Sequence, residues 1–342
     1  MNLNHNIAIS FILLICISAN PVYPQNIDTS NENIRLGKSS LIDELINDHG
    51  FDEQYIRTIF KDIKFMPELI DAISRPAEKT KTWDEYRGIF LTPKRIAAGV
   101  FFANQHKDLI NRVEKETGVP AKILVGILGV ETSFGNIQGR YKVVNSLYTL
   151  AVGYPPRSAF FREELINLFY LCREQDLSIT EIKGSYAGAM GAPQFIASSY
   201  RAYAVDGDGD GKINLFESWE DILMSIGHYL KENGWEESKN IINRIQIDNK
   251  QMEELASKTV TPKSTVADLA AAGIQLNPSL ELTEKAQVIY LEGLNSDEEA
   301  VIGLHNFYVI TTYNRNVMYA LAVLELGESI EGLVTNNAFS FN

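Results

Sequence analysis

An unbroken apolar run from Ile123 to Val130 most constrains how this chain folds, because it leaves no residue for a polar face. Pro120 precedes the run at a position that suits the first turn of a helix. The run is too short to cross a membrane as a helix. It therefore predicts a helix over 120–131 that is buried in a protein core.

Glu131 follows this run directly and places an ionisable carboxyl at the C-terminal end of the predicted helix. Desolvation by the apolar run and the negative end of the helix dipole both disfavour the carboxylate, so we expect a raised pKa. Such a carboxyl is a good general acid near neutral pH. Taken alone, however, the pattern favours a simpler interpretation, in which Glu131 is the first exposed residue after a buried helix.

The stretch DGDGDGKINLFE, residues 206–217, matches the calcium loop D-x-D-x-D-G-x5-E at every position. Ca2+ is a hard cation that prefers oxygen ligands, and the loop supplies them. The alternative is a solvated acidic turn. Because the loop lies far along the chain from Glu131, we expect a structural calcium site rather than a catalytic one, with these ligands: Asp206, Asp208, Asp210, the backbone carbonyl of Lys212, and Glu217.

Composition excludes several classes of protein. The chain has 342 residues, 45% of them hydrophobic, which is enough for a large core, and its formal net charge is −13. It lacks the basic stripe of a nucleic-acid binder, so we expect no nucleic-acid partner. The five histidines do not cluster, which predicts no zinc site. With Cys16 in the N-terminal segment, Cys172 has no partner for an internal disulfide.

The N-terminal segment has an apolar core from Ile7 to Ala19, followed by polar and proline-containing sequence. This pattern predicts a signal peptide over residues 1–25 and an exported protein of the periplasm or cell envelope. Cys16 leaves open a lipoprotein signal and association with the outer membrane, and an uncleaved anchor is the remaining alternative. Residues 26–39 are polar and predict a flexible leader.

The remaining periodicity predicts a mainly α protein (α+β) with a few short strands. The stretches AQVIYLE and NFYVITTYN, within about 287–311, are rich in β-branched and aromatic residues and predict those strands. SKTVTPKST, residues 257–265, is typical of a loop or linker. Further helices are expected over 40–60, 92–117, 159–175, 217–233, 264–271, 281–291 and 314–325.

Four motifs occur in the order found in a known family. They are TWDEYRGIF (82–90), GVETSFG (129–135), GSYAGAMGAPQFIASSYRAYAVDGDGDG (184–211) and VITTYNRNVMYALAV (309–323). Together they resemble the lytic murein transglycosylase B family over residues 40–330. The resemblance implies a catalytic region of that extent, with a lysozyme-like core over about 110–235 that contains the calcium loop, helical flanking regions, and a tail over 331–342.

The resemblance also implies a reaction. Family members cleave the β-1,4 bond between N-acetylmuramic acid and N-acetylglucosamine in peptidoglycan without using water. The C6 hydroxyl of the muramic acid attacks its own anomeric carbon and gives a 1,6-anhydro product. Glu131 matches the acid/base, which protonates the leaving oxygen and then takes the proton from the C6 hydroxyl. No second carboxylate, which most glycosidases use, is obvious near Glu131 or in GAMGAPQF.

The resemblance also matches other individual residues of this chain to functional positions of the family. Ser185 matches a serine next to the acid/base, and Arg157 matches one of two adjacent basic residues that meet the peptide stem, although here Pro156 precedes it. Asp221 matches the last calcium ligand of the family, so Asp221 and Glu217 both stay candidates. Taken alone, the aromatic residues could equally pack a core, and Asn314 could cap a helix. The residues matching the glycan groove are Tyr86, Gln194, Phe195, Tyr229, Tyr313 and Asn314.

The expected partners are peptidoglycan glycan strands and proteins of cell-wall synthesis or hydrolysis, and the expected state is a monomer. Two alternatives stay open. A hydrolytic muramidase would share Glu131 but place a carboxylate opposite it. A non-catalytic peptidoglycan-binding protein would tolerate other residues at that position.

Overall fold

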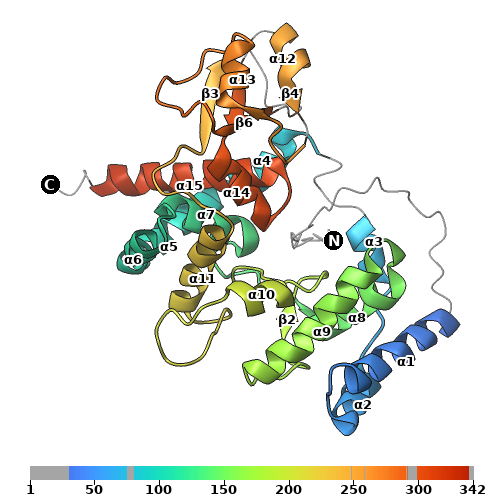
Figure 1. Cartoon of the computed structure of the whole chain (residues 1–342). Coiled ribbons are helices and arrows are strands. Elements are labelled where there is room, and N and C mark those ends of the chain that lie inside the picture. Colours follow the sequence, from blue (N-terminus) through green and yellow to red (C-terminus); the bar gives the residue numbers. More distant parts are fainter. Residues whose placement is uncertain are drawn as a thin grey trace, which may run out of the picture.

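The computed structural model describes residues 31–74, 81–247, 249–257, 259–289, 291 and 299–338. The predicted signal peptide, including Cys16, lies outside the described residues. Helices dominate, and a small sheet gathers at one end of the molecule (Figure 1). Within the described part of the chain, no helix has both the length and the hydropathy needed to cross a membrane.

One group of helices packs around α8 and forms the lower right of Figure 1. The single helix expected over 40–60 is wrong, because the chain turns at Gly50 (φ 65°) and Asp52 caps a second helix by accepting the Tyr55 N–H at 2.7 Å. The first helix begins at Asn31, within the expected leader. The group comprises α1 (Asn31–Asn47), α2 (Glu53–Asp62), α3 (Glu68–Ser74), α8 (Val143–Gly153) and α9 (Ser158–Glu174).

The second group surrounds α7, the helix predicted from the apolar run. The single helix expected over 92–117 is wrong, because His106 (φ −110°, ψ 23°) leaves the helical conformation and its ring packs on Phe102 and Trp219. The last helix extends into the expected tail. The group comprises α4 (Trp83–Phe90), α5 (Pro93–Gln105), α6 (Lys107–Thr117), α7 (Ala121–Thr132), α14 (His305–Tyr313) and α15 (Val317–Ala338).

The sheet has its own small apolar core and the strand order β3-β7-β6-β4, with β5 paired to β6. Only the β4–β6 pairing is parallel. Two short helices, α12 (Asn249–Leu255) and α13 (Val266–Ala271), accompany it at the top of Figure 1. The strands are β3 (Ile242–Gln246), β4 (Ala256–Ser257), β5 (Ser264–Thr265), β6 (Lys285–Ile289) and β7 (Glu299–Gly303).

Two expectations in this region are wrong. The strand predicted from AQVIYLE is confirmed as β6, and the helix also expected over 281–291 is wrong. Residues 286–289 are all buried, so no alternation separates this strand from a buried helix. The strand expected over 306–314 is helix α14. Its β-branched residues are buried on several sides, and Thr311 and Thr312 donate hydrogen bonds to carbonyls one turn back. Tertiary packing there outweighs local β propensity.

The remaining elements connect the two helical groups. Helices α10 (Ala197–Tyr203) and α11 (Trp219–Glu232) flank the acidic loop, and the short strands β1 (Tyr141–Lys142) and β2 (Lys183–Gly184) pair antiparallel. The helices expected over 159–175, 217–233 and 264–271 are confirmed as α9, α11 and α13.

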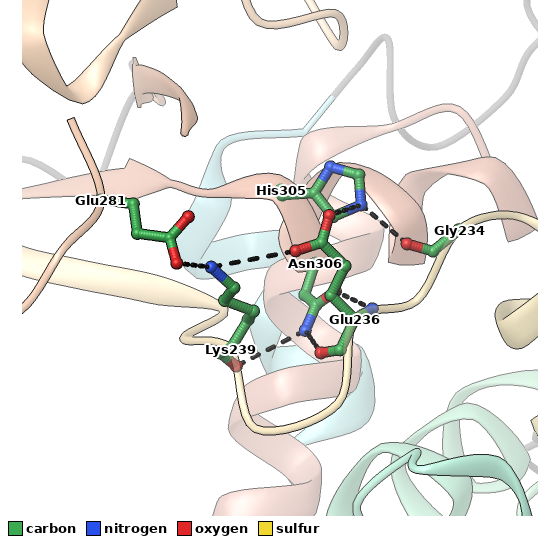
Figure 2. A network of polar contacts seen from close by, with 6 residues as sticks. All are labelled: Gly234, Glu236, Lys239, Glu281, His305 and Asn306. Carbon is green, nitrogen blue, oxygen red and sulfur yellow. Dashed lines mark hydrogen bonds and ion pairs between the residues drawn. The ribbon is translucent and has the colours of Figure 1, made fainter. Parts of the chain in front are cut away.

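A polar junction joins the sheet to the helices (Figure 2). Asn306, fully buried in the first turn of α14, donates to the Glu236 carbonyl at 2.7 Å and accepts the Glu236 N–H at 3.0 Å. His305 contacts the Gly234 carbonyl, and Lys239 pairs with Glu281. The Asn306 amide therefore satisfies both backbone groups of residue 236 at the point where the chain passes from α11 to β3.

We expect Asn306→Ala to lower the free energy of unfolding by about 1–3 kcal/mol, because it removes the two hydrogen bonds that this buried amide makes with the Glu236 backbone. His305→Ala, at the partly exposed neighbouring position, should cost less than about 1 kcal/mol. Denaturant titration followed by circular dichroism measures both. Equal losses would show that the buried amide has no special role at the junction.

Candidate active site

Glu131 lies in the last turn of α7 and is 8% exposed, so it is not the first exposed residue after a buried helix. The helix packs against α15 with direct contact of the two backbones. A Cβ atom on Gly126 would lie 2.3 Å from the Val323 carbonyl oxygen, and one on Gly327 would lie 2.1 Å from the Lys122 carbonyl oxygen. Larger residues at these two glycines would push α15 away from the carboxyl.

Tyr319 on α15 is the side chain that this close packing brings to Glu131. Its hydroxyl donates to Glu131 Oε1 at 2.7 Å, and the residue is 1% exposed. Burial, followed by the nearby Glu131 carboxyl, raises the pKa of Tyr319 well above its usual value. Tyr319 therefore keeps its proton and acts as a permanent hydrogen-bond donor to the carboxyl.

Three of the predicted groove aromatics form one cluster near Glu131. The ring of Tyr313 lies 5.0 Å from that of Tyr229, 5.8 Å from that of Phe195 and 6.4 Å from that of Tyr319. Tyr313 donates to the Pro193 carbonyl at 2.6 Å, and its pKa is raised by burial and by Glu131. Tyr229 is partly exposed and donates to the Thr312 carbonyl, and burial raises its pKa to about 12.

Gln194 and Ser185 are both buried and bonded to neighbouring backbone. Gln194 has a left-handed backbone (φ 52°), and its amide donates to the Gln138 and Gly191 carbonyls at 3.1 and 2.9 Å. The Ser185 hydroxyl oxygen accepts the Ala189 N–H at 2.9 Å. Both side chains therefore hold the shape of the loop between β2 and α10.

The other predicted groove residues lie in different surroundings. Tyr86 on α4, a helix that contacts α15, is 1% exposed and packs on Trp83 and Phe90. Asn314 is buried after α14, and it does not cap α15, because Asn316 accepts the Met318 N–H. Arg157 lies at the start of α9, with its guanidinium 4.2 Å from the Phe160 ring centre.

The acidic loop brings its first three carboxylates together. Ligand oxygens of Asp206, Asp208 and Asp210 all lie within 4.8 Å of one another, on exposed residues. Backbone N–H groups, that of Gly211 first, lower the pKa of Asp206 by hydrogen bonding. This set of hard oxygen donors, aligned in one turn, suits Ca2+.

The two candidates for the last ligand differ in position. Asp221 is 1% exposed, and its two oxygens accept the Gly207 and Asn214 N–H groups, both at 2.7 Å. Burial raises its pKa, and the nearby carboxylates of Asp208 and Asp206 contribute to the rise. Glu217 is exposed. Lys212, the predicted carbonyl ligand, is exposed and donates its N–H to Asp210.

Sequence reasoning missed Tyr319, which contacts the central carboxyl directly. It lies within the quoted motif VITTYNRNVMYALAV, but an aromatic residue in an apolar helix is typical of a core. It also missed Gln138, which accepts from Gln194, and Trp219, the first residue of α11.

The fold is mainly helical, and it buries Glu131 beside the Tyr319 phenol and the cluster of Phe195, Tyr229 and Tyr313. A family model described as the transglycosylase SLT domain matches residues 37–328. The chain therefore belongs to this family, and it is an enzyme of the peptidoglycan lytic transglycosylase class.

Individual relatives agree over most of the chain. It is 36% identical over 298 residues to the membrane-bound lytic murein transglycosylase B of Escherichia coli (strain K12), which covers 84% of this chain and 81% of that one. The crystal structure of the soluble lytic transglycosylase SltB1 from Pseudomonas aeruginosa is 41% identical, with a TM-score of 0.81 and coverage of 86% and 98%. The Escherichia coli lytic transglycosylase Slt35 in complex with calcium is 34% identical, with a TM-score of 0.79 and coverage of 87% and 94%.

We expect Tyr319→Phe to lower kcat by about 10-fold or more, because it removes a preorganised hydrogen bond to the Glu131 carboxyl. Loss of this donor disfavours the carboxylate relative to the acid, so the alkaline limb of the pH–rate profile should move to higher pH. Initial rates on isolated peptidoglycan across pH measure both effects. Tyr313→Phe is the matched control, since that phenol donates to a backbone carbonyl. An unchanged pH profile in Tyr319→Phe would contradict the assignment.

Proposed function

We propose that this enzyme cleaves the β-1,4 bond between N-acetylmuramic acid and N-acetylglucosamine without water, with Glu131 as its single general acid/base. The observation that carries the proposal is the buried carboxyl held by Tyr319 beside the aromatic cluster. SltB3 from Pseudomonas aeruginosa, a solved relative 28% identical to this chain, is described in complex with NAG-NAM-pentapeptide. We infer that the same class of glycan is the substrate here.

The proposed reaction needs one titrating group. Glu131 donates its proton to the glycosidic oxygen as the bond from that oxygen to the anomeric carbon of the muramic acid breaks. The carboxylate then takes the proton from the C6 hydroxyl, whose oxygen bonds to the same anomeric carbon and closes the 1,6-anhydro ring. The N-acetyl group of the substrate supports the oxocarbenium-like transition state, and no water is consumed.

The carboxyls of the described residues favour this mechanism over hydrolysis with two carboxylates. Three of them are buried: Glu131, Glu164 and Asp221. Glu164 accepts from the backbone and hydroxyl of Ser198, and Asp221 is bonded within the acidic loop. Both are therefore engaged in other parts of the fold.

We also infer that the acidic loop holds a structural Ca2+ ion. Asp206, Asp208 and Asp210 would supply side-chain oxygens, and Lys212 its carbonyl. The buried position of Asp221, bonded to both ends of the loop, favours it over the exposed Glu217 as the closing ligand. The ion would neutralise the converging carboxylates and fix the loop, with no part in the bond cleavage.

The proposal also covers the division of the chain into segments and the location of the enzyme. We propose a signal peptide over 1–25, a catalytic region over 40–330 with its lysozyme-like core over about 110–235, and an exported enzyme of the periplasm or cell envelope. Tyr86, Phe195, Tyr229, Tyr313 and Asn314 would form the glycan side of the site. Ser185 and Gln194 would shape it, and Arg157 would meet the peptide stem.

A muropeptide digest analysed by mass spectrometry tests the reaction. We expect anhydro-ended products from the wild-type enzyme and none from Glu131→Gln, because the variant has no proton to transfer. Glu164→Gln, a second buried carboxyl, is the matched control and should keep the anhydro products. Reducing-end products would mean hydrolysis, and no release by the folded wild type would favour a binding protein.

Isothermal titration calorimetry with Ca2+ tests which residues bind the ion. We expect Asp221→Asn to weaken Ca2+ binding by about 10-fold or more, and Glu217→Gln by less than about 3-fold. Asp206→Asn, at the first position of the loop, should be at least as damaging as Asp221→Asn. The reverse order for Asp221 and Glu217 would assign the closing ligand to Glu217.

A further inference from the structure

The turn that follows Glu131 has an uncommon backbone. Ser133, Phe134 and Gly135 have φ values of 50°, 60° and 80°, so three successive residues are in the left-handed region. Serine and phenylalanine rarely adopt this conformation, and it persists only where the surroundings hold it. The groups that hold this turn therefore also determine where the end of α7, with its carboxyl, lies.

One set of contacts joins this turn to the loop of Gln194. Thr132, next to Glu131, donates its hydroxyl to the Ala192 carbonyl at 2.8 Å and accepts the Gly135 N–H at 2.9 Å. Gln194 donates to the Gln138 carbonyl at 3.1 Å. The turn and the loop of Gln194 are thus bonded to each other at two points.

A second set of contacts joins both segments to the end of the acidic loop. Gln138 donates to the Phe216 carbonyl at 3.1 Å, and the Ala192 N–H donates to the Leu215 carbonyl at 2.8 Å. The Trp219 ring lies directly against Gly135, since a Cβ atom there would be 2.8 Å from Cη2 of the indole.

A series of aromatic ring contacts supports the same contact. The Trp219 ring centre lies 4.8 Å from that of Phe102, which lies 5.5 Å from that of Phe134 in the turn. The contact between the acidic loop and the turn after Glu131 is therefore both polar and aromatic.

The proposed cation site is bonded to these same residues. Ser218, between Phe216 and Trp219 in the chain, donates its hydroxyl to Asp208 Oδ2 at 3.2 Å and accepts the Asp221 N–H at 3.2 Å. Any change in how Asp208 and Asp221 are held therefore acts directly on the backbone at Trp219. Without a cation, the repulsion among the converging carboxylates opposes this arrangement.

We propose that Trp219 and Gln138 are positioning residues that transmit cation binding in the acidic loop to the strained turn after Glu131. The inference rests on the proposed calcium site and the proposed role of Glu131. With the cation bound, the segment 215–219 is fixed and holds the turn, and with it the carboxyl, in the arrangement described. Without the cation, the turn and the loop of Gln194 loosen together.

Amide hydrogen exchange, measured with Ca2+ and with EDTA and without any glycan, tests the proposal. In the wild type we expect Ca2+ to slow exchange at the Gly135 and Ala192 amides by about 5-fold or more, the size of a typical coupling between sites. In Trp219→Leu and in Gln138→Leu this protection should be lost, although calorimetry still detects Ca2+ binding. Trp235→Leu, just beyond the C-terminal end of α11, is the matched control and should keep the protection.

Gln138→Leu decides the outcome if Trp219→Leu no longer binds Ca2+, because Gln138 lies outside the loop. Equal protection in the wild type and in calcium-binding Gln138→Leu would overturn the proposal, as would no response of the Gly135 amide in the wild type. A wild type that binds no Ca2+ would overturn it together with the calcium site. The muropeptide digest judges the proposed reaction separately, since the exchange measurement needs neither substrate nor turnover.

Discussion

The direct contact between α7 and α15 is the constraint on which the site depends. Gly126 and Gly327 allow each helix to reach the backbone of the other, and only at this separation can the Tyr319 hydroxyl meet the Glu131 carboxyl. The two helices are far apart in the chain, so their pairing also draws the C-terminal region onto the predicted lysozyme-like core. The close packing at the two glycines therefore determines the geometry at the carboxyl.

Buried phenols suit the proposed site, in which a single carboxyl titrates. Burial raises the pKa of Tyr313, Tyr319 and Tyr229, so each phenol keeps its proton and donates a hydrogen bond to a fixed acceptor. None of them competes with Glu131 for a proton near neutral pH. In the proposed mechanism, a charge that develops on the carboxyl meets the fixed hydroxyl of Tyr319 instead of a second titrating group.

The sequence predicted elements well where one short stretch determines them. The apolar run gave α7 with nearly the correct ends, and the apolar spacing gave α9 and α11. Prediction from the sequence was less reliable where packing against distant segments determines the secondary structure. The segment that forms β6 is buried on both faces and shows no alternation, so the sequence predicted both a strand and a helix there. Helix α14 carries β-branched residues that its buried surroundings make compatible with a helix. At the break between α5 and α6, the His106 ring contacts Trp219, which comes from a different part of the chain.

The candidate site follows the same rule. The acids of the loop could be found because their motif is defined by immediate neighbours in sequence. Glu131 was a candidate for the same reason, but its local pattern alone favoured an exposed residue, and the family resemblance suggested its role. Tyr319 could not be found, because it meets Glu131 across 188 residues, and before folding it is one more aromatic residue in an apolar helix. The same holds for Gln138 and Trp219, which join the acidic loop to the turn after Glu131. Sequence pattern thus identifies the groups that change charge, whereas the groups that orient them become visible only when the fold brings separate segments together.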